Sequence, residues 1–325
     1  MTTSDARPVL HIPARDIPIP TSVSPEAQAV LARPHMPAED YPALEDIDGW
    51  HATIKSHDER MSTMFGARAT NLPVKTEDVD LGAFRVYVAT PEGVSSDDRR
   101  VVLEIHGGAF IYMGGDMCRL LGIGVALRMG ARVWAVDYRM PPEHPYPTPL
   151  DDCMAAYRAL LDDHRPEEIV VSGASAGGNL AAALVLRARD EGLPLPAAAV
   201  LMTPAVDLTD AGDSLQTNLG LDPLLPRTSE LVHQLYAGGH DLTDPHVSPL
   251  FGDFSKGFVP TILTTGTRDM LLSNTVRMHR ALRAAGIPAE LHVLEAGGHG
   301  GFMGEAPEDR ELLREVRQFA ESHWR

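Results

Sequence analysis

Apolar and polar residues follow two different spacings along the chain from about residue 82 onward. Continuous apolar runs such as "RRVVLEIH" and "EEIVVSG" are typical of strands that are buried on both faces of a sheet. Longer segments such as "PLDDCMAAYRALLDD" repeat their apolar residues every three or four positions, which predicts helices. Strands are therefore expected at 84–90, 99–106, 131–138, 167–173, 197–204, 261–267 and 289–296, and helices at 122–129, 149–163, 175–192, 273–286 and 307–323.

The regular alternation of strands and helices predicts the α/β class, with a mostly parallel central sheet covered by helices on both faces. The segment "FRVYVAT" alternates residue by residue, as an edge strand does. Sheets of this kind bind their ligands outside the carboxyl ends of the strands. Candidate functional residues are therefore sought just after each expected strand.

Two segments interrupt the alternation. Residues 1 to about 75 are rich in proline at first and then charged, and a few short helices are expected there. The segment from about 205 to 255 is long, rich in Pro, Gly and Asp, and holds one weak helix near 228–239. Long insertions at the carboxyl edge of a sheet are typical of lids. We expect one domain over 1–325, with a helical cap formed by about 1–75 and about 205–255.

Charge and composition exclude several classes of protein. The chain has 28 Lys and Arg against 45 Asp and Glu, a net charge of −17, which disfavours binding to nucleic acids or anionic membranes. No window holds 18 uninterrupted apolar residues, and the first twenty residues lack the apolar core of a secretion signal. Cys118 and Cys153 lie in no metal-ligand spacing and are expected to be reduced and buried. A cytoplasmic location is the resulting prediction.

The pentapeptide Gly173–Gly177 reads GASAG and stands between an expected strand and an expected helix. This is the G-x-S-x-G context in which a sharp turn lifts a serine, here Ser175, above the sheet as a nucleophile. A tight turn in which Ser175 merely caps the helix fits the five residues equally well. A phosphate-binding loop does not fit, because Gly178 and Asn179 stand where Lys and Ser or Thr are required.

Three other stretches favour the nucleophile. "HGGAF" follows an expected strand, and consecutive glycines let the amides of Gly107 and Gly108 reach an oxyanion, with the amide of Ala176 completing the hole. Asp269 and His299 each follow a later strand, in the chain order Ser, Asp, His of one hydrolase class. For Asp269 a helix-capping role is the alternative, and for His299 that of an ordinary loop histidine. None of the 14 histidines stands in a zinc-binding pattern, so we expect no metal and no cofactor.

At this point the chain resembles the bacterial hormone-sensitive-lipase-like carboxylesterases, which have the α/β-hydrolase fold. The blocks "HGGAF", "DYRMPPEHPYPTPLDD", "GASAGGN", "DPHVSPL" and "GTRDMLLSN…EAGGHGGF" carry the resemblance in family order. It implies Ser175 as nucleophile, Asp269 as orienting acid, His299 as general base, and Gly107, Gly108 and Ala176 as oxyanion donors. It also implies a structural pair between Arg139 and Glu143, with His144 as a scaffold residue.

The chain departs from the family pattern at three places, one of which is "IYMGGD", where the glycines stand a residue or two later than expected after HGGG. Ala109 replaces the third glycine of HGGG, and the hole then survives if Ala109 need not adopt a positive φ. Ala174 stands where relatives commonly have Asp or Thr before the nucleophile, so a polar side chain is missing beneath the turn.

The predicted function is hydrolysis of short- to medium-chain carboxylic esters through an acyl-enzyme. Leu221, Leu224, Leu225, Phe110 and Met113 are the expected pocket walls. A lactone or amide hydrolase with the same triad is the alternative, and a hydrolase-like small-molecule receptor is a third reading. The expected partner is a small ester substrate, and a homodimer is expected by analogy with similar proteins.

Overall fold

The computed structural model describes residues 9–36, 40–66, 72–225, 227 and 230–325. In that part of the chain, strands join in one eight-stranded sheet with the order β1-β2-β4-β3-β5-β6-β7-β8. The strands from β4 to β8 run parallel, whereas β1 and β2 pair antiparallel with each other and β2 pairs antiparallel with β4. The strands are β1 (Val74–Asp80), β2 (Arg85–Pro91), β3 (Val101–Ile105), β4 (Arg132–Asp137), β5 (Ile169–Ala174), β6 (Ala198–Met202), β7 (Thr261–Gly266) and β8 (Ala289–Leu294).

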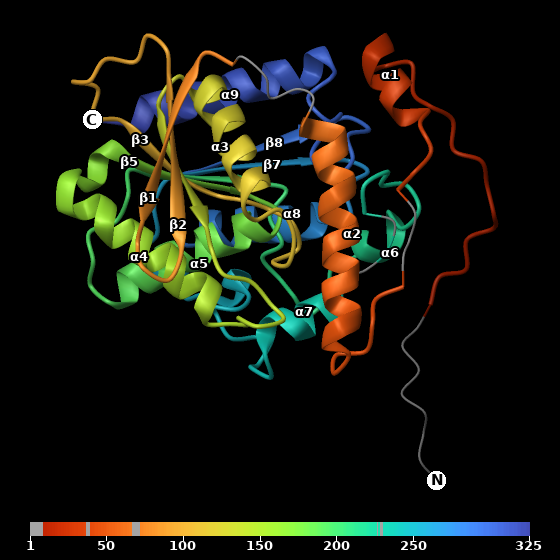
Figure 1. Cartoon of the computed structure of the whole chain (residues 1–325). Coiled ribbons are helices and arrows are strands. Elements are labelled where there is room, and N and C mark those ends of the chain that lie inside the picture. The colour runs from red at the N-terminus through yellow and green to blue at the C-terminus, as the bar shows by residue number, and fades with distance from the viewer. Residues whose placement is uncertain (1–8, 37–39, 67–71, 226, 228–229) are drawn as a thin grey trace.

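Helices cover both faces of the sheet, with α3 and α9 on one face and α4, α5 and α8 on the other (Figure 1). The α/β fold predicted from the alternation of elements is confirmed. The helices are α1 (Pro25–Leu31), α2 (Ile47–Gly66), α3 (Asp116–Met129), α4 (Thr148–Asp163), α5 (Ala176–Asp190), α6 (Ser214–Thr217), α7 (Glu230–Ala237), α8 (Leu272–Ala284) and α9 (Pro307–His323). Three short 3-10 helices lie at Pro166–Glu168, Pro249–Phe251 and Phe254–Lys256.

The central helix α5 owes its position to its composition. Its sequence is almost wholly Ala, Gly, Leu and Val, and nearly every residue from Ala176 to Ala188 is buried. A helix that is apolar all around must be covered on every side. It lies directly behind β5, so its N-terminus is fixed at the carboxyl edge of the sheet beside Ser175.

The edge of the sheet differs from the prediction. "FRVYVAT" forms β2, which is the second strand, and the true edge strand is β1, which the sequence pattern missed. β1 reads VKTEDVD and its residues are mostly exposed, so it carries no apolar alternation. Charged edge strands are common because they discourage pairing with other chains.

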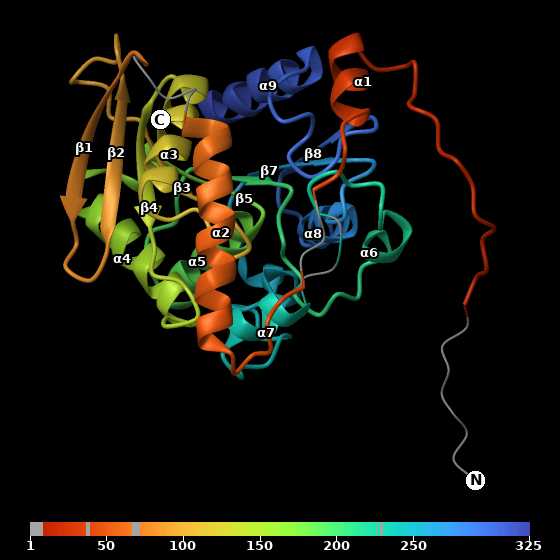
Figure 2. The same ribbon diagram turned by 45° about the vertical axis from the view of Figure 1, so that its right-hand side comes forward.

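The N-terminal region also differs. In place of a few short helices, its described residues form the seven-residue helix α1 and the twenty-residue helix α2. Figure 2 shows α2 standing alongside the sheet and α1 beside the end of α9. Trp50 of α2 is fully buried against Ile111 and Tyr112 of the loop after β3 and Val232 of α7. The long helix is therefore held by tertiary packing, which a local pattern does not record.

Candidate active site

Ser175 forms a strained turn between β5 and α5. Its backbone has φ 57° and ψ −120°, a region that residues with a side chain rarely adopt. A Cβ atom on Gly173 would overlap the carbonyl of Gly177, and one on Gly177 would overlap the carbonyl of Ile105. Glycine is therefore required on both sides of the serine, because backbone crosses backbone there. The strained, tightly crossed turn is the context in which a nucleophilic serine is presented.

The loop after β3 packs against this turn. A Cβ on Gly107 would stand 2.8 Å from the carbonyl oxygen of Ala174, and Gly108 has φ 105°. The backbone N–H groups of Gly107, Gly108, Ala109 and Ala176 donate to no described residue. Four uncommitted amide donors thus lie on the two segments that meet beside Ser175, as an oxyanion hole requires.

Ala109 corrects one expectation. The hole was expected to survive if Ala109 need not adopt a positive φ, but φ at Ala109 is 51° and at the next residue, Phe110, 66°. The loop turns back here, with the N–H groups of Ile111 and Tyr112 both donating to the carbonyl of Gly108. Alanine thus occupies a left-handed position that glycine adopts without strain.

His106 precedes the glycines and supports the loop. Its ring stacks on Tyr138 with centroids 4.2 Å apart, and its Nδ1 lies 2.7 Å from the carbonyl oxygen of Gly107. Burial lowers the pKa of His106, so the ring is neutral and its Nδ1–H donates to that carbonyl. The Tyr138 hydroxyl donates to the carbonyl of His106. The histidine therefore fixes the conformation of the loop.

Asp269 and His299 come together, although thirty residues separate them in the chain. Nδ1 of His299 lies 3.2 Å from Oδ1 of Asp269. Asp269 is fully buried and also accepts the Thr265 hydroxyl and the N–H of Leu271. Leu271 and not Asp269 is the N-cap of α8, so Asp269 braces the turn before the helix and does not cap it. A carboxylate fixed in this way holds one histidine tautomer, with Nε2 free to accept a proton.

The pKa of His299 is raised. Burial alone would lower it, but the charge and hydrogen bond of Asp269, together with the charge of Asp222, outweigh burial. His299 and Ser175 line the same cavity, but no hydrogen bond joins their side chains. Hydrogen bonds between a serine and its base are often long before substrate binds.

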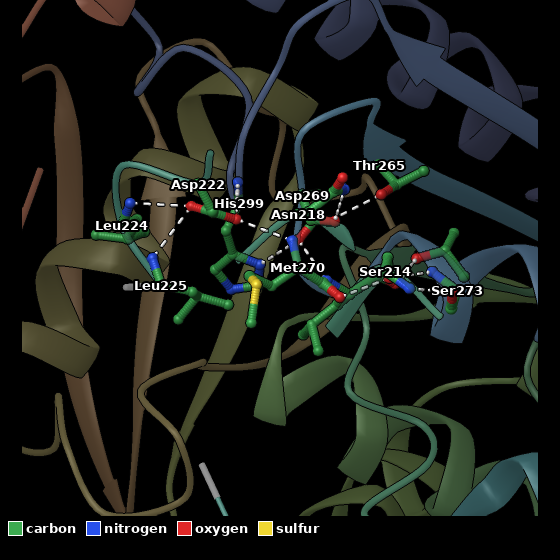
Figure 3. Close-up of polar contacts among 12 residues, drawn as sticks. Ser214, Asn218, Asp222, Leu224, Leu225, Thr265, Asp269, Met270, Ser273 and His299 are labelled. Atoms are coloured by element: carbon green, nitrogen blue, oxygen red, sulfur yellow. Dashed lines mark hydrogen bonds and ion pairs between the residues drawn. The ribbon is translucent and has the colours of Figure 1, made fainter. Parts of the chain in front are cut away.

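Asp222 is the residue at this site that the sequence reasoning missed. It is fully buried, and Figure 3 shows its carboxylate between the loop of Leu224 and the loop of His299. One oxygen accepts the N–H groups of His299 and Met270, each at 3.0 Å, and the other accepts those of Leu224 and Leu225. Burial raises the pKa of Asp222. The only signal in the sequence was an acidic residue followed by proline in the long insertion.

Further bonds tie the insertion to the loop that carries Asp269. The Asn218 side-chain amide donates to the carbonyls of Thr267 and Asp269 (Figure 3). The Ser214 hydroxyl donates to the carbonyl of Met270 and accepts the N–H of Ser273. Residues 214–225 therefore form one hydrogen-bonded unit with the candidate acid and base.

A cavity of about 380 Å³ contains Ser175 and His299. Of the expected pocket walls, Leu224, Leu225 and Met113 line it, whereas Leu221 is absent from its lining. Phe110 lines a separate space of about 40 Å³ on the other side of Ser175 and stacks on Tyr236. Most of the cavity surface is apolar, which suits an uncharged organic ligand.

The predicted pair of Arg139 and Glu143 is wrong. Arg139 donates instead to both carboxylate oxygens of Asp152, at 3.0 and 2.7 Å, while Glu143 contacts His51 of α2. Asp152 lies one turn inside α4 and is almost fully buried. A bidentate pair with a buried carboxylate is geometrically better defined than the short-range pairing within one loop that we expected.

One group among the described residues brings three possible metal ligands together, namely His106, Cys118 and Asp137. Both oxygens of Asp137 already accept hydrogen bonds, from Tyr87 and from the N–H of Gly115. Burial raises the pKa of Cys118, which disfavours the thiolate that a metal needs. The group therefore fits a metal poorly, and the absence of a catalytic metal stays a prediction. Cys118 and Cys153 are free and buried.

No helix among the described residues is long and apolar enough to cross a membrane.

Of the histidines in the insertion, His233 contacts Asp210 at 3.4 Å, His246 contacts Asp190 at 3.5 Å, and His240 packs edge-on against Tyr146. His233 lines the small space beside Ser175, whereas His240 and His246 line no described cavity next to it.

Comparison with known proteins shows which family the chain belongs to. A family described as having the alpha/beta hydrolase fold matches residues 102–303, more than half of the chain. An esterase of Acinetobacter venetianus is 35% identical over 233 residues, which cover 69% of this chain and 75% of that protein. Esterase LipU of Mycobacterium tuberculosis is 32% identical over 237 residues, which cover 69% of this chain and 77% of that protein.

Solved structures of esterases match nearly the whole chain. One esterase superposes with a TM-score of 0.91 at 35% identity, covering 98% of this chain and 99% of the other. An esterase described as belonging to the bacterial hormone-sensitive lipase family superposes with a TM-score of 0.78 at 28% identity, covering 93% and 99%. The chain therefore belongs to the alpha/beta hydrolase family, among the bacterial hormone-sensitive-lipase-like carboxylesterases.

Proposed function

We propose that the protein hydrolyses carboxylic esters through an acyl-enzyme formed on Ser175. The observation that carries this proposal is the pairing of His299 with buried Asp269 on the wall of the cavity that holds Ser175 on its strained turn. The named relatives are esterases, which supports the same class of reaction.

In the proposed reaction, Nε2 of His299 accepts the proton of the Ser175 hydroxyl while Oγ attacks the ester carbonyl carbon. The N–H groups of Gly107, Gly108 and Ala176 donate to the oxyanion that develops. They are free to do so because no described residue accepts from them. One such donor contributes roughly 3–4 kcal/mol to the transition state.

The intermediate then collapses. The bond to the alcohol breaks, and the His299 imidazolium gives its proton to the leaving oxygen. The charge of Asp269 stabilises that imidazolium, in agreement with the raised pKa of His299. Water, deprotonated by the same histidine, attacks the acyl-enzyme and releases the acid and free Ser175.

The segments of about 1–75 and about 205–255 would form the cap of this domain. In support, Trp50 of α2 and Val232 of α7 pack together over the loop that carries the oxyanion donors. Val23, Ala27 and Val30 around α1 pack against the loop after His299. A cavity of about 380 Å³ beneath these elements suits short- to medium-chain esters.

Labelling with a fluorophosphonate probe and mass spectrometry tests the nucleophile. The label should lie on Ser175 and be absent from the Ser175→Ala variant. Label on another residue of active enzyme would overturn the mechanism. Ser62→Ala, at an exposed position of α2, is the control and should label and react like the wild type.

Kinetics test whether the groups act as a unit. Ser175→Ala and His299→Ala should each lower kcat by roughly 10⁴- to 10⁶-fold, and the double variant should be little worse. Nearly additive losses would contradict a shared mechanism. Matched ester, lactone and amide substrates measured side by side decide which acyl compound is preferred, and no turnover of any would favour a receptor.

A further inference from the structure

The cavity at Ser175 continues inward along the face of the sheet that carries α3 and α9. Its floor beyond the nucleophile is made by side chains of β3, β5 and β6: Glu104, Ser172, Ala174, Val200 and Met202. Its other walls there come from α3 and α9, with Leu121, Val125, Arg128 and Val316 among them. We call this part of the cavity the inner arm.

Strand register orders the floor of the inner arm into rows. Glu104 pairs with Ser172, and Ser172 with Val200, so these three side chains lie abreast. Ala174 pairs with Met202 in the row closer to Ser175. Ser172 is three residues before Ser175, which places its row about 10 Å from the nucleophile at ~3.3 Å per residue.

Glu104 is an unusual residue for the middle of a buried strand. Its side chain is only 6% exposed, and Oε2 has no hydrogen-bond partner. Burial raises the pKa of Glu104 to about 7, although a hydrogen bond with Ser172 and the charge of Arg128 act in the opposite direction. An unpaired buried carboxyl oxygen is costly, so it calls for a ligand or another compensating role.

Arg128 lines the same arm from α3. Its guanidinium lies over Gly124, with Nη1 3.1 Å from the place where a Cβ on Gly124 would stand. No described residue accepts a hydrogen bond from it or pairs with it within 4.0 Å. The Arg128 side chain is exposed, and it lies close enough to Glu104 for the two charges to interact. The inner arm thus offers unused guanidinium donors together with an unused carboxyl acceptor.

We propose that the inner arm binds a chain of the ester substrate that ends in a hydroxyl group, which donates to Glu104 and accepts from Arg128. This rests on the proposed ester hydrolysis. A hydroxyl fits because it is both donor and acceptor. A carboxylate would be repelled by Glu104 when that side chain is ionised, and an ammonium would be repelled by Arg128. The chain spans about eight bonds, at ~1.2 Å per bond along an extended chain.

Ala174 is the passage to this arm. It lies between Ser175 and Ser172 along β5, and its side chain lines the cavity. Relatives commonly carry the larger Asp or Thr here, as noted from the sequence. The methyl group leaves room for a chain to pass from the nucleophile toward Glu104. The departure from the family motif and the buried carboxyl of Glu104, with the exposed Arg128 beside it, are therefore parts of one specificity device.

Two substrate series test the proposal and tell the acyl half of the ester from the alcohol half. The first compares p-nitrophenyl octanoate with its ω-hydroxy counterpart, and the second compares octyl acetate with ω-hydroxyoctyl acetate. We expect kcat/KM to favour the hydroxylated ester by about 10- to 100-fold in one series, since a site built to hydrogen-bond a hydroxyl rejects the analogue lacking it. Ratios within about twofold of one in both series would overturn the proposal.

Variants then locate the preference. Glu104→Leu and Arg128→Met should each bring the ratio in the responsive series to within about twofold of one. Glu77→Leu on exposed β1 and Arg310→Met on the exposed side of α9 are matched controls and should keep it. A ratio that persists in both inner-arm variants would overturn the assignment. Because each ratio is taken within one variant, a general loss of activity cancels, and circular dichroism confirms folding.

Ala174→Val tests the passage. It should lower kcat/KM for the eight-carbon ester of the responsive series at least about tenfold relative to its two-carbon counterpart, which is p-nitrophenyl acetate in the acyl series and ethyl acetate in the alcohol series, because the long chain alone must pass the new methyl groups. An unchanged ratio would mean that the chain does not pass Ala174. Hydrolysis of p-nitrophenyl acetate by the wild type reports on the proposed function separately. If acetate is hydrolysed and no hydroxyl preference is found, only the inner-arm assignment fails.

Discussion

Asp222 holds His299 by its backbone, with Oδ2 of the aspartate accepting the histidine N–H at 3.0 Å. The same oxygen accepts the N–H of Met270, the residue after Asp269, also at 3.0 Å. One buried carboxylate thus sets the separation between the loops of the candidate acid and base. Asp222 is a positioning residue, since it acts through the backbone of His299.

Asp222→Asn should lower kcat about 10- to 100-fold, equivalent to about 1.4–2.8 kcal/mol. An asparagine turns an NH₂ group toward N–H donors, so two of the four bonds are lost. The pKa of His299 should also fall, because the charge of Asp222 contributes to raising it. Steady-state kinetics against pH measure both effects. Asp213→Asn, on an exposed side chain, is the control, and an unmoved pH profile would reduce Asp222 to a purely structural role.

The pH dependence of kcat/KM follows from the raised pKa of His299. The base must be neutral, so activity should fall as pH drops through a pKa that lies above the ordinary 6.5. Asp269→Asn removes the charge and the ionic hydrogen bond that raise this pKa. The acid limb should then move to lower pH while kcat drops steeply. If the acid side of the kcat/KM profile does not move in this variant, a group other than His299 controls it.

Ala109→Gly should stabilise the fold by about 0.5–1 kcal/mol, because the left-handed backbone at φ 51° strains alanine and not glycine. The gain is smaller than the strain itself, since glycine makes the unfolded chain more flexible. Urea unfolding measures the difference. Ala281→Gly, in the middle of α8, is the opposite control and should cost about 1 kcal/mol. If both substitutions lower the free energy of unfolding, the backbone strain at Ala109 is contradicted.

Glu104→Gln should flatten the dependence of unfolding free energy on pH. The folded-state pKa of about 7 lies above the ordinary value of 4.5, so the protonated form stabilises the fold. That stability is present below pH 4.5 and is lost as pH rises through 7, on the order of 3 kcal/mol in all. Urea unfolding of the wild type and the Glu104→Gln variant at pH 5 and pH 8 isolates the contribution of Glu104 to the free energy of unfolding. If the free energy of unfolding changes equally with pH in the two proteins, the raised pKa of Glu104 is contradicted.

Most of the sheet could be predicted because parallel strands are short apolar runs and the intervening helices repeat every three to four residues. The same local logic selects Ser175, Asp269 and His299 as candidates, since each follows such a run. β1 escaped because its residues are polar and its pairing with β2 is what makes it a strand.

Other features depend on contacts between distant parts of the chain. The partner of Arg139 is Asp152, on the next helix, and no spacing rule distinguishes it from Glu143. Asp222 joins an insertion to two later loops, which only the folded chain brings together. The sequence shows Glu104 only as a member of an apolar run. That one of its carboxylate oxygens lacks a hydrogen-bond partner can be seen only when the neighbouring strands are in place.

The bonds from Ser214, Asn218 and Asp222 to the loops of Asp269 and His299 have a consequence for substrate entry. A cover that swings away from the sheet would take these bonds with it and disassemble the base at the moment of opening. Residues 214–225 therefore behave as a fixed rim. Any opening of the cap would then fall to its other segments, since residues 214–225 must stay in place to keep His299 paired with Asp269.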